Sequence, residues 1–224
     1  MLRDDYITRL IEKLSVVTVR VNALKLQRQW DEARQAIRDA SQQLLGIHPA
    51  IIDRLPYRDL IQMIGGNRRE LRKGIIVAEL LKLEAEIARA RGDDAKSFQQ
   101  SLKSLNILIT VLLEDAQLRS EPYYSDQVEA LAAAFAEYEI PADSKQLLFQ
   151  YYEATGKYGK AEDMLYELLE EETGRAAWIE QGIGFYQRLL AKGEAELAGG
   201  NLPRAELIEG LERLEKYRLE VPLA

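Results

Sequence analysis

The stretch YYEATGKYGKAEDMLYELLE, residues 151–170, places a glycine, an aromatic residue and an alanine inside a segment with helical periodicity. Glycine tolerates the left-handed backbone conformation that commonly ends a helix, so Gly156 is expected at the close of one helix. Ala161 then lies in the first turn of the next helix, where its small side chain lets the two backbones approach. Tyr158 lies between them and can fill the turn. The stretch therefore predicts the corner of a helical hairpin.

Similar turns occur at three other places: RQWDEA at residues 28–33, GDDAKS at 92–97 and GNLPRA at 200–205. In each turn the last residue is small, and the glycine, where present, is expected to close the preceding helix. Trp30 and Leu202 take the position of the residue that fills the turn. Together the four turns predict four helical hairpins.

The spacing of these turns is uneven. The small residues Ala33, Ser97 and Ala161 are each separated by 64 residues, whereas Ala205 follows after only 44. Two equal intervals predict one extra short helix after each of the first two hairpins. These helices are expected at residues 57–64 and 125–138.

Helical periodicity extends over almost the whole chain. Apolar residues recur at spacings of three and four, as in the row Leu10, Leu14, Val17 and Val21. The β-branched run SVVTVRV, residues 15–21, favours a strand by propensity, but the helical row continues on both sides of it. Period-two alternation is scarce. The chain is therefore predicted to be all-α, with about nine to ten helices joined by short loops.

The composition limits the classes of function. Of the 224 residues, 47% are hydrophobic and 30% are charged, and no stretch reaches the roughly 18 apolar residues of a membrane-spanning helix. Because no cysteine is present, disulfides, thiolate nucleophiles and cysteine-based metal sites are excluded. No secretory signal is recognisable at the start. We therefore expect a cytoplasmic protein that does not bind membranes.

The net charge of −7 is unevenly distributed. Residues 1–75 hold 14 Lys and Arg against 9 Asp and Glu, a net +5, and residues 76–224 hold 16 against 28, a net −12. Solvated helix faces account for such a distribution, and so does a molecule whose two ends meet different partners. A pI near 5.1, without a basic and aromatic stripe, argues against nucleic acid as a partner.

Residues 142–173 resemble a tetratricopeptide repeat, with Tyr152, Gly156, Ala161 and Leu165 at the family's characteristic offsets. The resemblance implies a right-handed array of antiparallel helical hairpins, a solenoid that forms a single helical-repeat domain over residues 1–224. The hairpins are expected near residues 4–46, 70–118, 142–173 and 175–218.

The chain also departs from the tetratricopeptide pattern. Phe149 and Leu168 stand where that family prefers small residues, and no proline closes the unit at Thr173. A regular array would repeat every 34 residues or so. The predicted array is therefore degenerate, with interhelix distances or angles that differ from the family norm.

The segment DDYITRLIEKL and the following LKLQRQWDEARQAIRDASQQLLGI are similar to an uncharacterised conserved bacterial family. Its members begin with a helix of the Asp-Tyr-Ile-x-Arg-x-Ile type and continue into a repeat hairpin that ends in Leu-Leu-Gly. This resemblance implies a fold and carries no activity.

Few residues suggest catalysis or metal binding. His48 is the one histidine, and its place beside a helix-ending glycine and before a proline is typical of a solvated loop or a C-terminal cap, with a general base as the alternative. The acidic run ELLEEET, residues 167–173, is typical of a solvated helix end, with a cation site as the alternative. No catalytic residue, cofactor or metal site is predicted.

The basic run GGNRRELRK, residues 65–73, lacks the phosphate-loop pattern. Arg68 and Arg69 begin a helix there, where cations oppose the helix dipole. An acidic group in the C-terminal part of the chain, or an anionic partner, is expected to offset them.

A stack of hairpins would line its concave face with the first helix of each hairpin. The tetratricopeptide offsets select a polar set of candidate binding residues: Asn22, Lys25, Lys82, Arg89, Gln146, Gln150 and Glu153. Asn22 takes the position where some members of that family hold a peptide backbone or carboxylate. The lysine that accompanies it there is Thr18 in this chain, so that clamp is not reproduced.

These observations favour a non-catalytic protein-interaction or scaffold module that binds a protein or peptide. The alternative is a helical regulator that responds to a ligand or peptide held in an enclosed pocket with convergent polar groups. An enzyme on a helical scaffold is the third hypothesis.

The N-terminal helix carries a second apolar stripe, formed by Val16, Val19, Ala23 and Leu26. Such a stripe favours association when it is left in water. It is therefore expected either to form a homodimer or to be covered by a later part of the chain.

Overall fold

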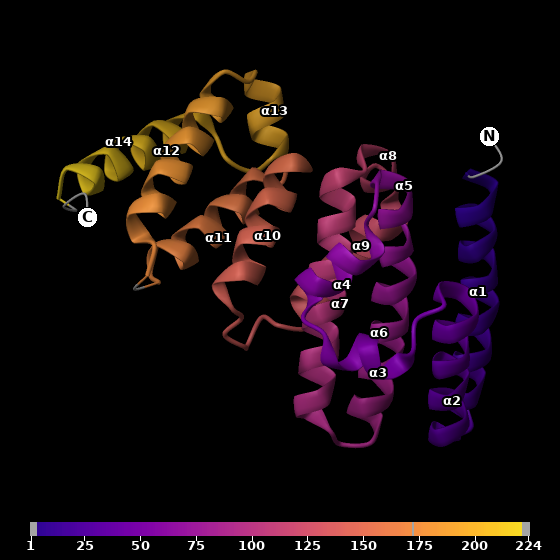
Figure 1. The fold of residues 1–224 in the computed structure, drawn as a ribbon. Helices are drawn as coiled ribbons and strands as arrows, with labels where there is room; N and C mark the ends of the chain where they lie inside the picture. The colour runs from indigo at the N-terminus through magenta and orange to yellow at the C-terminus, as the bar shows by residue number, and fades with distance from the viewer. Residues whose placement is uncertain (1–3, 172, 221–224) are drawn as a thin grey trace. The chain divides into compact units, whose positions relative to one another are not determined.

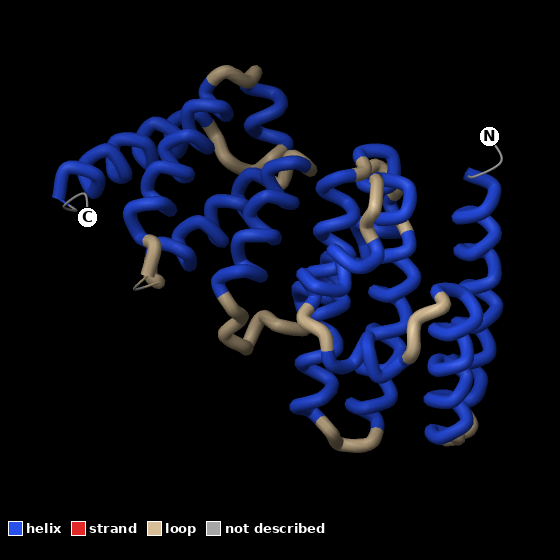
Figure 2. Tube along the Cα trace, in the orientation of Figure 1, coloured by secondary structure: helices blue, strands red, loops and turns tan. Residues whose placement is uncertain are grey.

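The computed structural model describes residues 4–171 and 173–220, and the regular elements among them are all helices (Figures 1 and 2). The all-α prediction is confirmed. The chain forms two compact units, Met1–Glu137 and Tyr138–Ala224. Residues 1 and 224, the predicted ends of a single repeat domain, lie outside the described residues, as does residue 172 of the third hairpin. That the two units make one domain stays a prediction.

The helices differ widely in length. The first unit contains α1 (Asp4–Leu26), α2 (Trp30–Ala40), the π-helix Ser41–Leu45, α3 (Pro49–Arg54), α4 (Tyr57–Ile64), α5 (Arg68–Leu71), α6 (Lys73–Ala90), α7 (Asp94–Glu114), α8 (Ala116–Arg119) and α9 (Pro122–Ala133). The second unit contains α10 (Ala142–Ala154), α11 (Tyr158–Leu169), α12 (Arg175–Leu190), α13 (Glu194–Gly199) and α14 (Arg204–Glu220). The described residues hold more helices than expected, because short helices such as α3, α8 and α13 form between the longer ones.

Helix α1 packs its predicted apolar stripe against α2 and α6. Leu10, Leu14 and Val21 are buried there. This burial explains why the run SVVTVRV is helical despite its β-branched residues, since tertiary packing overrides a weak local propensity. The second stripe lies outside. Val16 and Val19 are 70% and 69% exposed, so no described helix of the first unit covers them.

Helices α6 and α7 form the centre of the first unit. Every residue of α6 from Gly74 to Leu81 is buried, because α1 and α2 pack on this helix as well as α7. A Cβ at Gly74 would lie 2.6 Å from Val111 Cγ2, so the missing side chain lets α6 and α7 cross closely. Ser104 on α7 donates its hydroxyl to the carbonyl of Ala78 on α6 over 2.7 Å.

The first three predicted turns share one geometry. Arg28, Gly92 and Gly156 each have a positive φ, and the residue after each donates its N–H to a helix carbonyl five positions earlier over 2.9 Å. This is the backbone pattern that closes a helix around a left-handed residue. The helices that follow, α2, α7 and α11, begin 64 residues apart, as the spacing predicts.

The fourth turn departs from the prediction by one residue. Asn201, and not Gly200, takes the left-handed conformation, with a φ of 57°. The expected contact residue Ala205 is therefore out of register and exposed, whereas Ala33 and Ala161 are fully buried. The prediction for Ala205 is wrong for this reason, and also because α14 packs mainly on α12.

The stretch at residues 151–170 serves a second contact besides its own turn. Gly159 donates its N–H to the Gly200 carbonyl over 2.9 Å. A Cβ at Gly200 would lie 2.2 Å from Tyr158 Cδ2, and a Cβ at Gly159 would lie 2.8 Å from the Asn201 oxygen. Tyr158 is buried between the two turns. The third and fourth turns thus pack against each other within the second unit.

In the second unit α10 packs on α11, and α12 packs on both α11 and α14. A Cβ at Gly182 would lie 2.4 Å from Leu214 Cδ1 and 2.9 Å from Leu165 Cδ2, so α11, α12 and α14 approach one another closely at this glycine. Tyr186 is fully buried and donates its hydroxyl to Glu162 Oε1 over 2.6 Å. Burial and this bond raise the pKa of Tyr186 far above its ordinary value.

The four main helix pairs are α1 with α2, α6 with α7, α10 with α11, and α12 with α14. They match the predicted hairpins as far as those bounds are described, except that α14 extends two residues past the predicted end at residue 218. The extra helix expected at residues 57–64 is α4. The one expected at 125–138 is α9, which ends earlier, at Ala133. Beyond it the chain turns so that Phe135 is buried, with its ring centroid 5.3 Å from that of Phe98. The stacking of the pairs into a right-handed array stays a prediction.

Candidate functional site

Four of the seven predicted binding residues lie close together in the first unit. On α1, Lys25 donates to Asn22 Oδ1 over 3.0 Å and also forms an ion pair with Glu86 of α6. Lys82 and Arg89 lie one turn before and one turn after Glu86 on the same helix. Spacings of three and four residues put these side chains on one helix face.

This face borders a hollow of about 240 Å³ between α6, α7 and α9. Its polar lining consists of Lys82, Glu86 and Arg89 from α6, Ser97 and Ser101 from α7, and Gln127 from α9. The remaining lining is alanine and one leucine. The small side chains leave room for an incoming group, and the polar ones can orient it.

Most charges around this hollow already have partners. Lys82 Nζ lies 2.8 Å from Glu79 Oε2, which also accepts a hydrogen bond from Gln127 Nε2 over 3.2 Å. Glu86 is held in the ion pair from α1. Arg89 is exposed and has no ion pair or hydrogen bond among the described residues. The hollow therefore has one guanidinium without a compensating acid.

Ser97 is the polar group inside the hollow. It is 3% exposed, and its Oγ has no hydrogen-bond partner in the described part of the chain. Because buried hydroxyl groups are nearly always hydrogen-bonded, this unused group indicates a place for a ligand atom. Ser101, one helical turn further along α7, is 6% exposed.

The other three predicted residues lie on α10 in the second unit. Glu153 accepts two hydrogen bonds from Arg188, over 2.7 and 2.9 Å, and is thus already paired. Gln146 is half-buried and Gln150 is exposed. The tetratricopeptide offsets therefore select no comparable cluster in the second unit, but one member of an ion pair and two glutamines.

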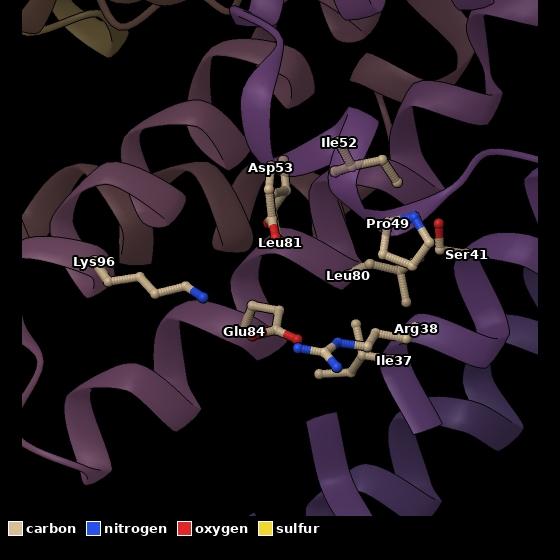
Figure 3. Close-up of a pocket in the computed structure, with 10 residues that line it drawn as sticks. All are labelled: Ile37, Arg38, Ser41, Pro49, Ile52, Asp53, Leu80, Leu81, Glu84 and Lys96. Atoms are coloured by element: carbon tan, nitrogen blue, oxygen red, sulfur yellow. The ribbon is translucent and has the colours of Figure 1, made fainter. Parts of the chain in front are cut away.

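A second, smaller cavity of about 30 Å³ lies between α2, α3, α6 and α7 (Figure 3). Half of its lining is apolar, namely Ile37, Pro49, Ile52, Leu80 and Leu81. Four charged residues also line it, namely Arg38, Asp53, Glu84 and Lys96. Such a mixture of apolar walls and a few converging charges is typical of a ligand site.

Glu84 is the buried charge of this cavity, at 8% exposure. Arg34 Nε lies 3.3 Å from Glu84 Oε2, but neither atom makes a hydrogen bond within the described residues. Burial raises the pKa of Glu84, and the charge of Arg34 opposes this shift only in part. One carboxylate oxygen is thus left to accept a hydrogen bond.

Two cations face this carboxylate. Figure 3 shows the side chains of Arg38 and Lys96 pointing toward Glu84 from different sides. Neither side chain forms an ion pair or hydrogen bond among the residues that the structure describes. Asp53 is the other acid in the lining, and it accepts a hydrogen bond from Gln100 Nε2 over 3.2 Å. The lining thus holds two cations and two acids, and Arg34 beside Glu84 adds a third cation.

The sequence reasoning missed this second cavity. The position of Glu84 could have indicated this site, because Glu84 lies between Leu80 and Ile87 on the buried side of α6, where a charge needs a partner. Nothing in the sequence indicated Arg38 and Lys96 as site residues, because each occurs on a helix with a solvated face and only the fold brings them together.

His48 is exposed, as expected for a solvated residue. It is not a C-terminal cap but the N-cap of α3, where its Nδ1 accepts the N–H of Ala50 over 3.2 Å. The acidic run at 167–173 is not merely solvated, because Glu171 accepts a hydrogen bond from Lys145 Nζ over 2.8 Å. Lys145 is 6% exposed, so the run neutralises a buried lysine.

The basic run at 65–73 meets its expected acid. Arg72 Nε donates to Asp115 Oδ2 over 2.6 Å, and Arg68 Nη2 lies 3.6 Å from Oδ1. Asp115 is 1% exposed and is also the N-cap of α8, where it accepts the N–H groups of Gln117 and Leu118. A residue of the acidic C-terminal part thus offsets Arg68 and Arg72, whereas the side chain of Arg69 lies outside what the structure describes.

Within the described residues, no three His, Cys, Asp or Glu side chains gather closely enough to hold a metal ion. Among the same residues, no helix has both the length and the apolar character needed to cross a bilayer.

Comparison with curated proteins and with solved structures found no match. Comparison with family models matched residues 1–218 to a family of unknown function, DUF6483. This result confirms the expected membership in an uncharacterised conserved family, whereas the likeness to tetratricopeptide repeats stays a resemblance. The chain belongs to the family of unknown function DUF6483.

Proposed function

We propose that this protein is a non-catalytic interaction module that binds an acidic peptide segment of a partner protein in the hollow between α6, α7 and α9. The observation that carries the proposal is the pairing of an uncompensated guanidinium, Arg89, with an unused buried hydroxyl, Ser97, in one hollow. A carboxylate that enters the hollow accepts hydrogen bonds from both groups. Charge-assisted hydrogen bonds of this kind are the strong ones.

The size of the hollow favours a side chain as its occupant. Its volume of about 240 Å³ is below the roughly 300–1,000 Å³ typical of small-molecule pockets. An aspartate or glutamate side chain of a docked segment needs less room than a free metabolite. This comparison favours the interaction module over the regulator with an enclosed ligand pocket.

The paired charges beside the hollow supply orientation. Lys25 with Glu86 and Lys82 with Glu79 present alternating signs along its α6 border. Such a pattern selects the register of a peptide more than it adds affinity. The proposal includes a tetratricopeptide-like, right-handed stacking of the helix pairs, supported by the 64-residue interval between the starts of α2, α7 and α11.

A displayed library of random peptides tests the proposal. Selection on the wild-type protein is expected to enrich peptides with Asp or Glu at one fixed position. Arg89→Glu should abolish binding of these peptides, and Ser97→Ala should weaken it several-fold, as expected for one lost hydrogen bond. Arg54→Glu is the matched control, because Arg54 is exposed on α3, outside the hollow, and undergoes the same change of charge.

Two results would contradict the proposal. One is a selection that yields no enrichment of Asp or Glu at any fixed position of the peptides. The other is equal binding of the selected peptides by the wild type and the Arg89→Glu variant.

A further inference from the structure

We propose that the small cavity between α2, α3, α6 and α7 binds a phosphate group that carries a proton (Figure 3). None of the residues that line this cavity lines the peptide hollow. The inference therefore stands independently of the proposed interaction function.

The cations of the cavity call for an anion. Arg38 and Lys96 point into it and have no hydrogen bond or ion pair through their side chains in the described part of the chain. With Arg34 they make three cations against the carboxylates of Glu84 and Asp53. One further negative charge balances the group, and guanidinium and ammonium donors together suit the several oxygens of an oxyanion.

The buried acid calls for a donor on the same ligand. Glu84 Oε2 is buried without a hydrogen bond, and an unsatisfied buried carboxylate oxygen is costly. A ligand that offers only bare oxygens would meet this carboxylate with like charge. A hydrogen phosphate group satisfies both requirements, because its P–OH donates to Glu84 while its other oxygens accept from Arg38 and Lys96. Sulfate and carboxylate ions lack that donor.

The dimensions of the cavity suit a small head group. Its volume of about 30 Å³ exceeds the roughly 10–15 Å³ that one water requires, yet it excludes a complete metabolite. A shallow hollow of about 490 Å³ adjoins it and shares Arg38, Pro49 and Asp53 with it. The phosphate can therefore be the free ion, or the head of a monoester whose organic part occupies the shallow hollow.

Calorimetric titration of the full chain at pH 6 and constant ionic strength tests the site with three probes: inorganic phosphate, ethyl phosphate and sulfate. At this pH about half of a phosphate monoester keeps its second proton. Inorganic phosphate should bind at least tenfold more tightly than sulfate. Tighter binding of ethyl phosphate would identify a monoester as the ligand, and weaker binding would identify the free ion.

Three variants locate the binding. Arg38→Gln and Lys96→Gln should each weaken phosphate binding about tenfold or more, as expected for loss of a charged hydrogen bond. Glu84→Gln should reduce the preference for phosphate over sulfate, because the amide also offers a donor to sulfate. Arg54→Gln, which removes an exposed charge from α3 outside the cavity, should bind like the wild type.

Three results would overturn the proposal. They are equal binding of phosphate and sulfate, no phosphate binding by the wild type, and phosphate binding that survives both the Arg38 and Lys96 substitutions.

Discussion

Replacing Asp115 with asparagine should destabilise the first unit by about 1.5–3 kcal/mol at neutral pH, the usual contribution of a hydrogen bond to a charged group. Asparagine retains an oxygen for the N-cap of α8, so this variant isolates the charge that Arg72 binds over 2.6 Å. Asp115→Ala should cost about 1 kcal/mol more, because it also removes the cap. The magnitude is large for one carboxylate because Asp115 is 1% exposed.

The stabilisation that Asp115 contributes should depend on pH in one direction. Burial tends to raise the pKa of Asp115, but the hydrogen bonds from Arg72 and from the Leu118 N–H outweigh it and hold that pKa below the ordinary 3.8. A depressed folded pKa means that the ionised carboxylate stabilises the fold above the unfolded pKa. This stabilisation is lost as the pH falls through the folded pKa. The difference between wild type and Asp115→Asn should therefore be constant from neutrality to near pH 4 and shrink below it.

Urea unfolding followed by tryptophan fluorescence measures both quantities. The chain has two tryptophans, Trp30 in the first unit and Trp178 in the second, so a Trp178→Phe background reports on the first unit alone. Asp126→Asn is the control, because Asp126 is exposed on α9 and its substitution should change stability by less than about 0.5 kcal/mol. Equal unfolding midpoints of wild type and Asp115→Asn at pH 7, or a difference that grows in acid, would refute the reasoning.

Three further predictions concern other contacts. Gly159→Ala should destabilise the second unit by about 1–3 kcal/mol, because its Cβ would lie 2.8 Å from a backbone oxygen of the fourth turn. Gly184→Ala would place its Cβ 3.1 Å from Nη1 of Arg188, the guanidinium nitrogen that makes neither bond to Glu153, and should leave stability unchanged or raise it by up to about 1 kcal/mol. The Trp178 signal in urea distinguishes the two variants, and a stabilised Gly159→Ala would contradict the packing. Glu171→Gln should cost about 1.5–3 kcal/mol at pH 7. The hydrogen bond to Glu171 outweighs burial and raises the pKa of Lys145, so the stabilisation by this pair disappears as the pH rises through that pKa. The cost of Glu171→Gln should therefore diminish in strong alkali, and an undiminished cost there would contradict the prediction. If α1 forms a homodimer, sedimentation at micromolar concentration should show a dimer for wild type and a monomer for Val19→Glu, and a monomeric wild type rules the dimer out.

Most helices follow from the sequence because their causes are local. A row of apolar residues at helical spacing lies on one face of a helix wherever that helix packs, and so α1 forms across a β-branched run. Gly156 ends its helix because a left-handed residue costs glycine little. The 64-residue interval between turns likewise predicts the short helix α4 at its observed bounds.

The fourth turn shows where local reasoning fails. Gly200 and Asn201 both tolerate the left-handed conformation, so the sequence alone leaves the choice between them open. In the structure Asn201 is the left-handed residue, while Gly200 accepts the Gly159 N–H through its carbonyl over 2.9 Å and lies against Tyr158 without room for a side chain. The register of the turn thus goes together with a contact between Gly200 and Tyr158, 42 positions earlier in the chain.

The candidate sites, too, were predictable from the sequence only in part. Lys82 and Arg89 could be selected from the sequence, because spacing along one helix determines which side chains share a face. That Arg89 lacks an acidic partner could not be predicted from the sequence, because it depends on which neighbouring charges are already paired. The bond from Arg72 to Asp115 spans 43 residues, and the cavity around Glu84 is lined by residues of five helical segments. Helical periodicity specifies which faces are buried but not which faces meet, so these pairings arise only when the tertiary packing brings distant helices together.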